Sequence, residues 1–98
     1  MKPFYADYAN HALRFYIRHR DVSEFRCPAD RLNWEACDEV YKNLQPEQQT
    51  AVSTIYQQYG MIRDAVVAAA ATLNVEPPVL WKLVSDVSAE VARVRGLM

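Results

Sequence analysis

The sequence predicts an all-α protein, a compact bundle of about five helices in a single domain spanning residues 1–98. Each of the five prolines precedes a helical pattern of apolar residues, and proline is tolerated in the first turn of a helix but costly inside one. Both glycines, Gly60 and Gly96, follow such a pattern, as residues that end helices do. No segment alternates apolar and polar residues with the period of two that a half-buried strand requires.

The composition is that of a folded domain with balanced charge. Hydrophobic residues make up 51% of the chain, and 11 Lys and Arg accompany 12 Asp and Glu. This balance argues against strong non-specific binding to nucleic acid or to a membrane surface, which requires a basic excess. The first residues lack the apolar core of a signal peptide, and no run approaches the roughly 18 apolar residues that cross a bilayer. We therefore expect a cytoplasmic protein without membrane association, in which Cys27 and Cys37 are reduced.

The first three helices are expected over residues 3–19, 28–44 and 46–59. When their residues are placed at 100° per step, each helix has an apolar face. The face of the first helix covers half a circle, which is wider than the stripe of an ordinary surface helix. This width predicts a central helix with two neighbours or, alternatively, an aromatic edge left open for a partner. The apolar stripe of the third helix is expected to end at Tyr59.

The last two helices, expected over residues 61–73 and 77–95, have the outline of a helix-turn-helix within residues 61–97. Asn74 follows the first of them, where a residue that tolerates left-handed backbone geometry is favoured. The second has the sharpest apolar pattern in the chain, an arc of about 140° on the helical repeat. The arc consists of Val79, Leu80, Leu83, Val84, Val87, Val91 and Val94. We expect this helix to contribute most of the apolar core, so that a charge within the arc unfolds the domain.

A second face of the helix over residues 77–95 places one large aromatic side chain among small residues. Its members are Trp81, Ser85, Ser88, Ala89 and Ala92. We favour packing of this face against one of the first two helices. The alternative is a surface for a protein partner or for a second copy of the chain, with contacts at Trp81, Ser85, Ala89 and Ala92.

The polar residues form no pattern typical of catalysis or metal binding. The two glycines stand apart, so the chain has no glycine-rich phosphate loop. His11 and His19 lie about 12 Å apart along one helix, and the spacing of Cys27 and Cys37 is unlike that of a zinc site. The sequence therefore predicts a protein that is not an enzyme and has no catalytic residue, metal, cofactor or small-molecule substrate.

Residues 44–84 resemble region 4 of bacterial sigma factors and related small phage transcription regulators. In that family a Leu-Pro-Glu opening and an Ile/Leu-Tyr helix precede a motif of the form Ala-x-x-Leu-Gly-Val-Ser. The matching positions are Leu44, Pro46, Glu47, Ile55, Tyr56, Ala70, Leu73, Asn74 and Val75. The whole chain also resembles small proteins of phage and mobile-element origin, especially in residues 80–83 and 93–97. The resemblance implies a helix-turn-helix and a regulatory role that depends on binding DNA or a component of the transcription machinery, such as RNA polymerase.

In a helix-turn-helix protein that reads DNA, the start of the second helix carries polar side chains that reach the bases. The residues available for such contacts are Arg63, Lys82 and Ser85, and Arg14, Arg18 and Arg20 are candidates for contacts with the DNA backbone.

Two features depart from the sigma pattern. The second helix begins with Pro77, Pro78, Val79 and Trp81, and Glu76 replaces the usual serine cap. Residues 60–98 contain four basic and four acidic residues, which leaves little charge to neutralise phosphates. The alternative hypothesis is therefore a protein-protein interaction module with a degenerate helix-turn-helix that does not read DNA. Its contact surface would include Trp81 and the aromatic edge of the first helix.

Overall fold

A computed structural model describes residues 5–97. In that range the chain forms α1 (Ala6–Arg18), α2 (Pro28–Lys42), α3 (Pro46–Tyr56), α4 (Ile62–Leu73) and α5 (Pro77–Arg95), and it contains no strand. The prediction of an all-α bundle of about five helices is confirmed. Proline lies in the first turn of α2, α3 and α5, where its missing N–H leaves no helical hydrogen bond unmade. The predicted start of the first helix at Pro3 lies outside the described residues.

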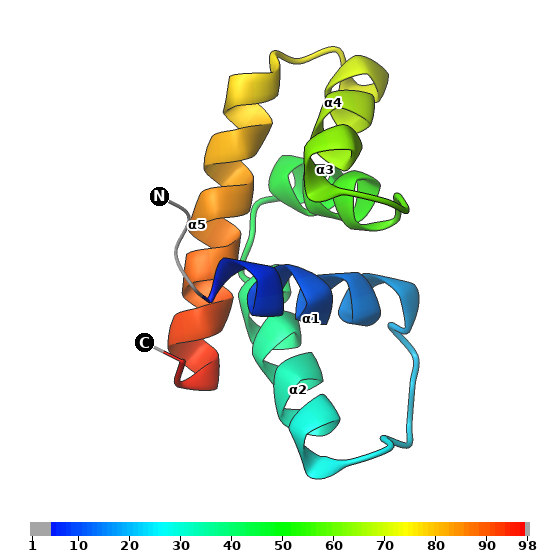
Figure 1. Cartoon of the computed structure of the whole chain (residues 1–98), viewed down its shortest axis with the longest axis vertical. Coiled ribbons are helices and arrows are strands. Elements are labelled where there is room, and N and C mark those ends of the chain that lie inside the picture. Colours follow the sequence, from blue (N-terminus) through cyan, green and yellow to red (C-terminus); the bar gives the residue numbers. More distant parts are fainter. Residues whose placement is uncertain (1–4, 98) are drawn as a thin grey trace.

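The central helix is α5, which contacts each of the other four. Figure 1 shows α1 and α2 beside the C-terminal half of α5, and α3 and α4 beside its N-terminal half. Because α1 contacts α2, α3 and α5, it has the several neighbours that its wide apolar face predicts. All five helices contribute to the largest fully buried side chains, which are Tyr16, Tyr56, Leu13, Ile55, Val52, Val66, Val91 and Cys37.

The apolar arc of α5 is only partly buried. Its buried members are Leu80, Val84, Val87 and Val91. Leu83 and Val94 are half-buried and pack against the edge of the core. Val79 is 60% exposed, so its predicted place in the core is wrong. The reason is that the side chains of α3 and α4 leave a hollow open beside the first turns of α5.

The third helix is shorter than predicted. It ends at Tyr56, and the chain turns through backbone hydrogen bonds from Gln57 N to Ser53 O and from Gln58 N to Ile55 O. Tyr59 therefore leaves the expected apolar stripe and is 82% exposed. Gly60 follows with a φ of 86°. Glycine adopts this left-handed conformation without strain, and an α-helix cannot continue through it.

The turn between α4 and α5 has the geometry that the sequence predicts. Asn74 adopts left-handed backbone angles, with φ 56° and ψ 48°. Its N–H donates to Ala71 O, and the N–H of Val75 donates to Ala70 O at 3.0 Å. These two bonds form a Schellman motif, which satisfies carbonyl groups at the end of α4 and reverses the chain into α5.

We expect Asn74→Val to lower the free energy of unfolding by about 1–2 kcal/mol, because a β-branched residue is strained in the left-handed region. Asn74→Gly should stay within about 0.5 kcal/mol of the wild type, since glycine adopts this conformation freely. Urea unfolding followed by circular dichroism measures both values. Equal stability of the valine and glycine variants would mean that this turn does not hold a left-handed residue.

The two cysteines differ in environment. Cys37 belongs to α2 and lies in the core, and burial raises the pKa of its thiol to about 12. Cys27 is exposed just before α2. In the unfolded chain the Cys37 thiol ionises near pH 9. Between pH 9 and 12 the unfolded state therefore releases a proton that the folded state retains, and folding loses stability as the pH rises.

We expect the free energy of unfolding to fall by about 1 kcal/mol between pH 8 and pH 10 through this thiol. Cys37→Ala should remove that part of the decline, whereas Cys27→Ala should leave it in place. Urea unfolding at half-unit pH intervals measures the slope. A decline in the free energy of unfolding that is unchanged in Cys37→Ala would assign the decline to another group.

In the folded protein we also expect a thiol reagent to modify Cys27 rapidly and Cys37 only after denaturation.

Candidate functional site

The helix-turn-helix-like unit consists of α4, the turn around Asn74 and α5. Both helices also pack on α3, so the unit is fixed to the rest of the domain. Figure 1 shows the turn at one end of the molecule, together with the start of α5. This end therefore holds the positions at which a DNA-reading helix would carry its polar side chains.

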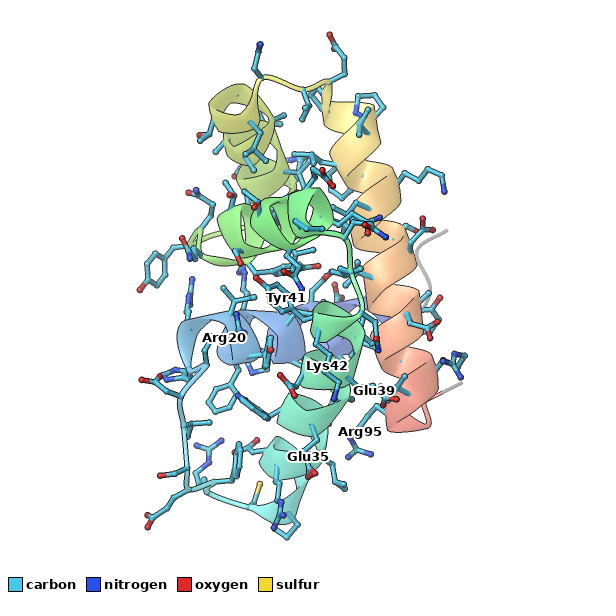
Figure 2. All side chains as sticks on the ribbon, turned by 180° about the vertical axis from the view of Figure 1, so that it is seen from behind. Arg20, Glu35, Glu39, Tyr41, Lys42 and Arg95 are labelled. Atoms are coloured by element: carbon cyan, nitrogen blue, oxygen red, sulfur yellow. The ribbon has the colours of Figure 1, made fainter. Side chains whose placement is uncertain are left out.

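Two of the candidate DNA contacts, Arg18 and Arg20, already bind other parts of the protein. Arg18 Nη2 donates to Gln58 O at 2.9 Å, and its guanidinium lies 3.9 Å from the centre of the Tyr59 ring. The Arg20 guanidinium lies 4.9 Å from the Tyr16 ring and 4.5 Å from the Tyr41 ring, and Figure 2 shows it beside Tyr41. Stacking on aromatic faces fixes the two side chains and occupies one face of each cation.

Arg14 points into the protein. Its Nε and Nη2 atoms are buried, and no residue in the described range of 5–97 offers them a hydrogen-bond acceptor. Its charge acts on Tyr56, because a nearby cation favours the ionised phenol, although burial outweighs it and raises the Tyr56 pKa. Arg14 is half-buried, and the burial of two of its three nitrogen atoms limits its contact with a phosphate outside the protein.

The other three candidates lie on the helix-turn-helix-like unit but in different surroundings. Arg63 Nε lies 4.0 Å from Asp64 Oδ1, with both side chains exposed. Lys82 Nζ lies 3.0 Å from Asp86 Oδ2. Arg63 and Ser85 line a hollow of about 340 Å³ together with Trp81, whereas Lys82 lines a separate hollow. The structure thus divides the six predicted DNA contacts among several places instead of gathering them on one face.

Much of the second face of α5 is buried. Ala92 and Ser88 are buried and Ala89 is half-buried, and α5 packs against both α1 and α2, so the favoured expectation of packing against one of the first two helices agrees with this part of the face. Ala92 offers no surface to a partner, which corrects the alternative prediction for that residue. Trp81 remains 38% exposed, and with Ser85 it lines the hollow between the starts of α1 and α4.

The sequence prediction missed a hollow on the surface of the helix-turn-helix-like unit. It has a volume of about 610 Å³ and lies between α3, the end of α4 and the start of α5. Its apolar lining consists of Ala51, Leu73, Val75, Val79, Leu80 and Leu83. The sequence analysis placed Val79, Leu80 and Leu83 in the core. The apolar arc of α5 shows which residues are apolar, but it does not show how far the neighbouring helices extend over them.

A second hollow of about 390 Å³ continues along α5 toward its C-terminal half. It lies between α2 and α5, and Val40, Leu44, Val87 and Val94 are among its lining residues. Gln48, Leu83 and Asp86 line both hollows, which therefore meet beside the start of α3.

Residues 5–97 offer neither a metal site nor a membrane-spanning helix. No group of three or more His, Cys, Asp or Glu side chains in this range is placed to hold a metal ion. None of its helices combines the length and apolar character that crossing a bilayer requires. No family model, curated protein or solved structure matches the chain.

Proposed function

We propose that this chain is a small, non-enzymatic regulatory protein whose helix-turn-helix-like unit binds a protein partner and does not read DNA. The observation that carries the proposal is the apolar character of the exposed surface at the start of α5. Val79 is exposed there, Val75 of the preceding turn is exposed beside it, and both line the hollow between α3, α4 and α5. Exposed apolar side chains that gather in a hollow are typical of a protein-binding surface.

The arrangement of the basic residues supports the same proposal. Phosphate binding requires protein cations that are free to contact the phosphates and displace the counterions condensed on the DNA. Arg18 and Arg20 are stacked on tyrosines, and Lys82 is paired with Asp86. A DNA complex would compete with these contacts for the cations, whereas a protein that binds the apolar start of α5 would leave them in place.

The resemblance to sigma region 4 suggests the kind of process in which the protein acts. A regulator of phage or mobile-element type with this module would bind a protein component of the transcription machinery. In this role the helix-turn-helix-like unit serves as a rigid platform, because the Schellman turn and the contacts with α3 fix α4 and α5 relative to each other.

DNA binding by the same unit is the second candidate function. One observation favours it: Asn74 adopts the left-handed conformation at the position where the helix-turn-helix turn requires it. In that case Lys82 and Ser85, both exposed on α5, would contact the major groove after Lys82 leaves Asp86. Arg63 would contact the DNA backbone from the start of α4.

A titration of labelled protein with mixed-sequence duplex DNA at about 50 mM salt, where electrostatic attraction is strong, distinguishes the two candidates. Amide chemical shifts report the contact surface. We expect no shift change at high micromolar DNA concentration. Saturable changes confined to residues 77–85 and 14–20 would overturn the proposal and establish the DNA-binding alternative. Lys82→Ala should then abolish them, while Lys42→Ala on α2 should not.

A further inference from the structure

The two hollows beside α5 form one open channel, which we call the α5 groove. Its floor is defined by four residues of α5, Val79, Leu83, Val87 and Val94, and its walls come from α2, α3 and the end of α4. The floor residues recur at intervals of four, four and seven along one face of the helix. From Val79 to Val94 the floor extends about 22 Å at the rise of an α-helix.

The dimensions of the α5 groove fit a helix better than an extended peptide. A length of about 22 Å accommodates four turns of an α-helix. An extended peptide gains affinity by pairing its backbone with a sheet edge, and the described residues contain no strand that could offer one. An amphipathic helix needs only an apolar channel for a stripe of side chains at positions i, i+3, i+4 and i+7.

The charged residues along the α5 groove are mainly acidic. Four carboxylate side chains line it with two basic ones, and these are Glu39, Glu47, Asp86, Glu90, Lys82 and Arg93. Both basic residues are paired within α5, Lys82 with Asp86 and Arg93 with Glu90. Glu39 projects from α2 toward α5 in Figure 2, and Glu47 lies at the start of α3. The carboxylates of Glu39 and Glu47 are thus placed on two walls of the groove.

We propose that the α5 groove binds an amphipathic α-helix of a partner protein, with apolar residues on the helix facing the groove and Lys or Arg on the flanks facing its acidic walls. This inference rests on the proposed function and specifies the chemistry of the partner. Carboxylates along the walls attract a basic helix, orient it and repel an acidic one. They would also repel nucleic acid and the anionic surface of a membrane.

A second copy of this chain does not provide such a helix. The exposed large apolar residues in the described range include one each on α1, α2 and α4, which are Tyr8, Leu32 and Val67. None of these three helices therefore presents large exposed apolar residues that repeat at helical spacing. On α5, Val79 already forms the floor of the groove, and Trp81 lines the separate hollow with α1 and α4. These observations favour a helix of another protein as the occupant.

The test uses three synthetic peptides of about 16 residues, a length of four to five helical turns. The first places leucine at helical spacing i, i+3, i+4 and i+7 and lysine on the flanks. The second replaces each lysine with glutamate, and the third scrambles the first. Each is titrated into the labelled full chain at about 100 mM salt while amide shifts and heat are recorded. We expect the basic amphipathic peptide to shift the amides of Leu83, Val87 and Val94 and to bind at least about 10-fold more tightly than the other two.

A matched pair of variants locates the binding surface. Val79→Asp puts a charge on the groove floor, whereas Val67→Asp makes the same change at an exposed valine of α4 outside the groove. Both positions are solvent-exposed, so both variants should fold with native circular dichroism. We expect Val79→Asp to weaken binding of the basic peptide about 10-fold and Val67→Asp to change it less than about twofold. Glu47→Gln should weaken it by a smaller factor and reduce its dependence on salt.

Four outcomes would overturn the inference. Equal binding of the scrambled peptide would show that helical periodicity is not recognised, and equal binding of the acidic peptide would show that the walls do not select charge. Sedimentation of a dimer that Val79→Asp dissociates would make a second copy the occupant. If no peptide perturbs the groove, helix docking fails. The DNA titration then reports separately whether the proposed protein-binding function also fails.

Discussion

Substitution of Val91 by Asp should unfold the domain. Val91 is 2% exposed on α5, in the half of the helix that packs against α1 and α2. An aspartate there would be buried among apolar side chains, either as a carboxylate or as a protonated acid. Either form should lower the free energy of unfolding by at least about 4 kcal/mol. A domain of this size has a total stability of about 5–15 kcal/mol, so this loss removes a large part of it and unfolds a domain at the lower end of that range. Circular dichroism should show a melting temperature lowered by about 15 °C or more, or no folded signal at 25 °C.

The matched control is Val79→Asp, the same substitution on the same helix. Val79 is exposed, so its carboxylate stays hydrated and the melting temperature should change by less than about 5 °C. A Val91→Asp variant as stable as Val79→Asp would mean that this face of α5 is not in the core. The comparison separates two residues that belong to one apolar arc in the sequence.

Much of the fold was predictable because the signals for helix ends are local. Proline at the start of α2, α3 and α5 and a left-handed Asn74 or Gly96 after α4 and α5 act through the backbone of a few neighbouring residues. The predicted bounds of the last helix agree with α5 for the same reason. The error at Tyr59 is also local: the turn bonds of Gln57 and Gln58 end α3 three residues earlier than the apolar pattern suggested.

The exposure of each face depends on how the helices are arranged, which periodicity does not specify. Ala92 is buried while Val79 is exposed, although both are apolar residues of α5. The same limit applies to the candidate site. From the sequence, Arg18 and Arg20 are two cations near the end of a helix. Their contacts with Tyr59 and Tyr41 bring together residues far apart in the chain and become evident only in three dimensions.

The second large effect is expected at Tyr56, which joins the α3 part of the molecule to α1. Its ring is fully buried, and its hydroxyl donates a hydrogen bond of 2.6 Å to Asn10 Oδ1. Tyr56→Ala should lower the free energy of unfolding by about 3–5 kcal/mol, because it removes a buried aromatic ring and leaves a cavity. Tyr56→Phe keeps the ring and loses only the hydrogen bond, which should cost about 1–2 kcal/mol. Urea unfolding measures both losses.

Tyr59→Ala is the control, since it removes a tyrosine three positions later whose ring is exposed and contacts Arg18. Its effect should stay below about 1 kcal/mol, the size of an exposed cation–π contact. A loss in Tyr59→Ala as large as that in Tyr56→Ala would contradict the burial of Tyr56 between α3 and α1.

Tyr56 fixes α3, and α3 forms a wall of the α5 groove. Loss of the Tyr56 hydrogen bond should loosen α3 and widen the groove, so Tyr56→Phe should also weaken binding of the basic peptide. Unchanged binding with reduced stability would show that the groove is maintained by α4 and α5 without this bond.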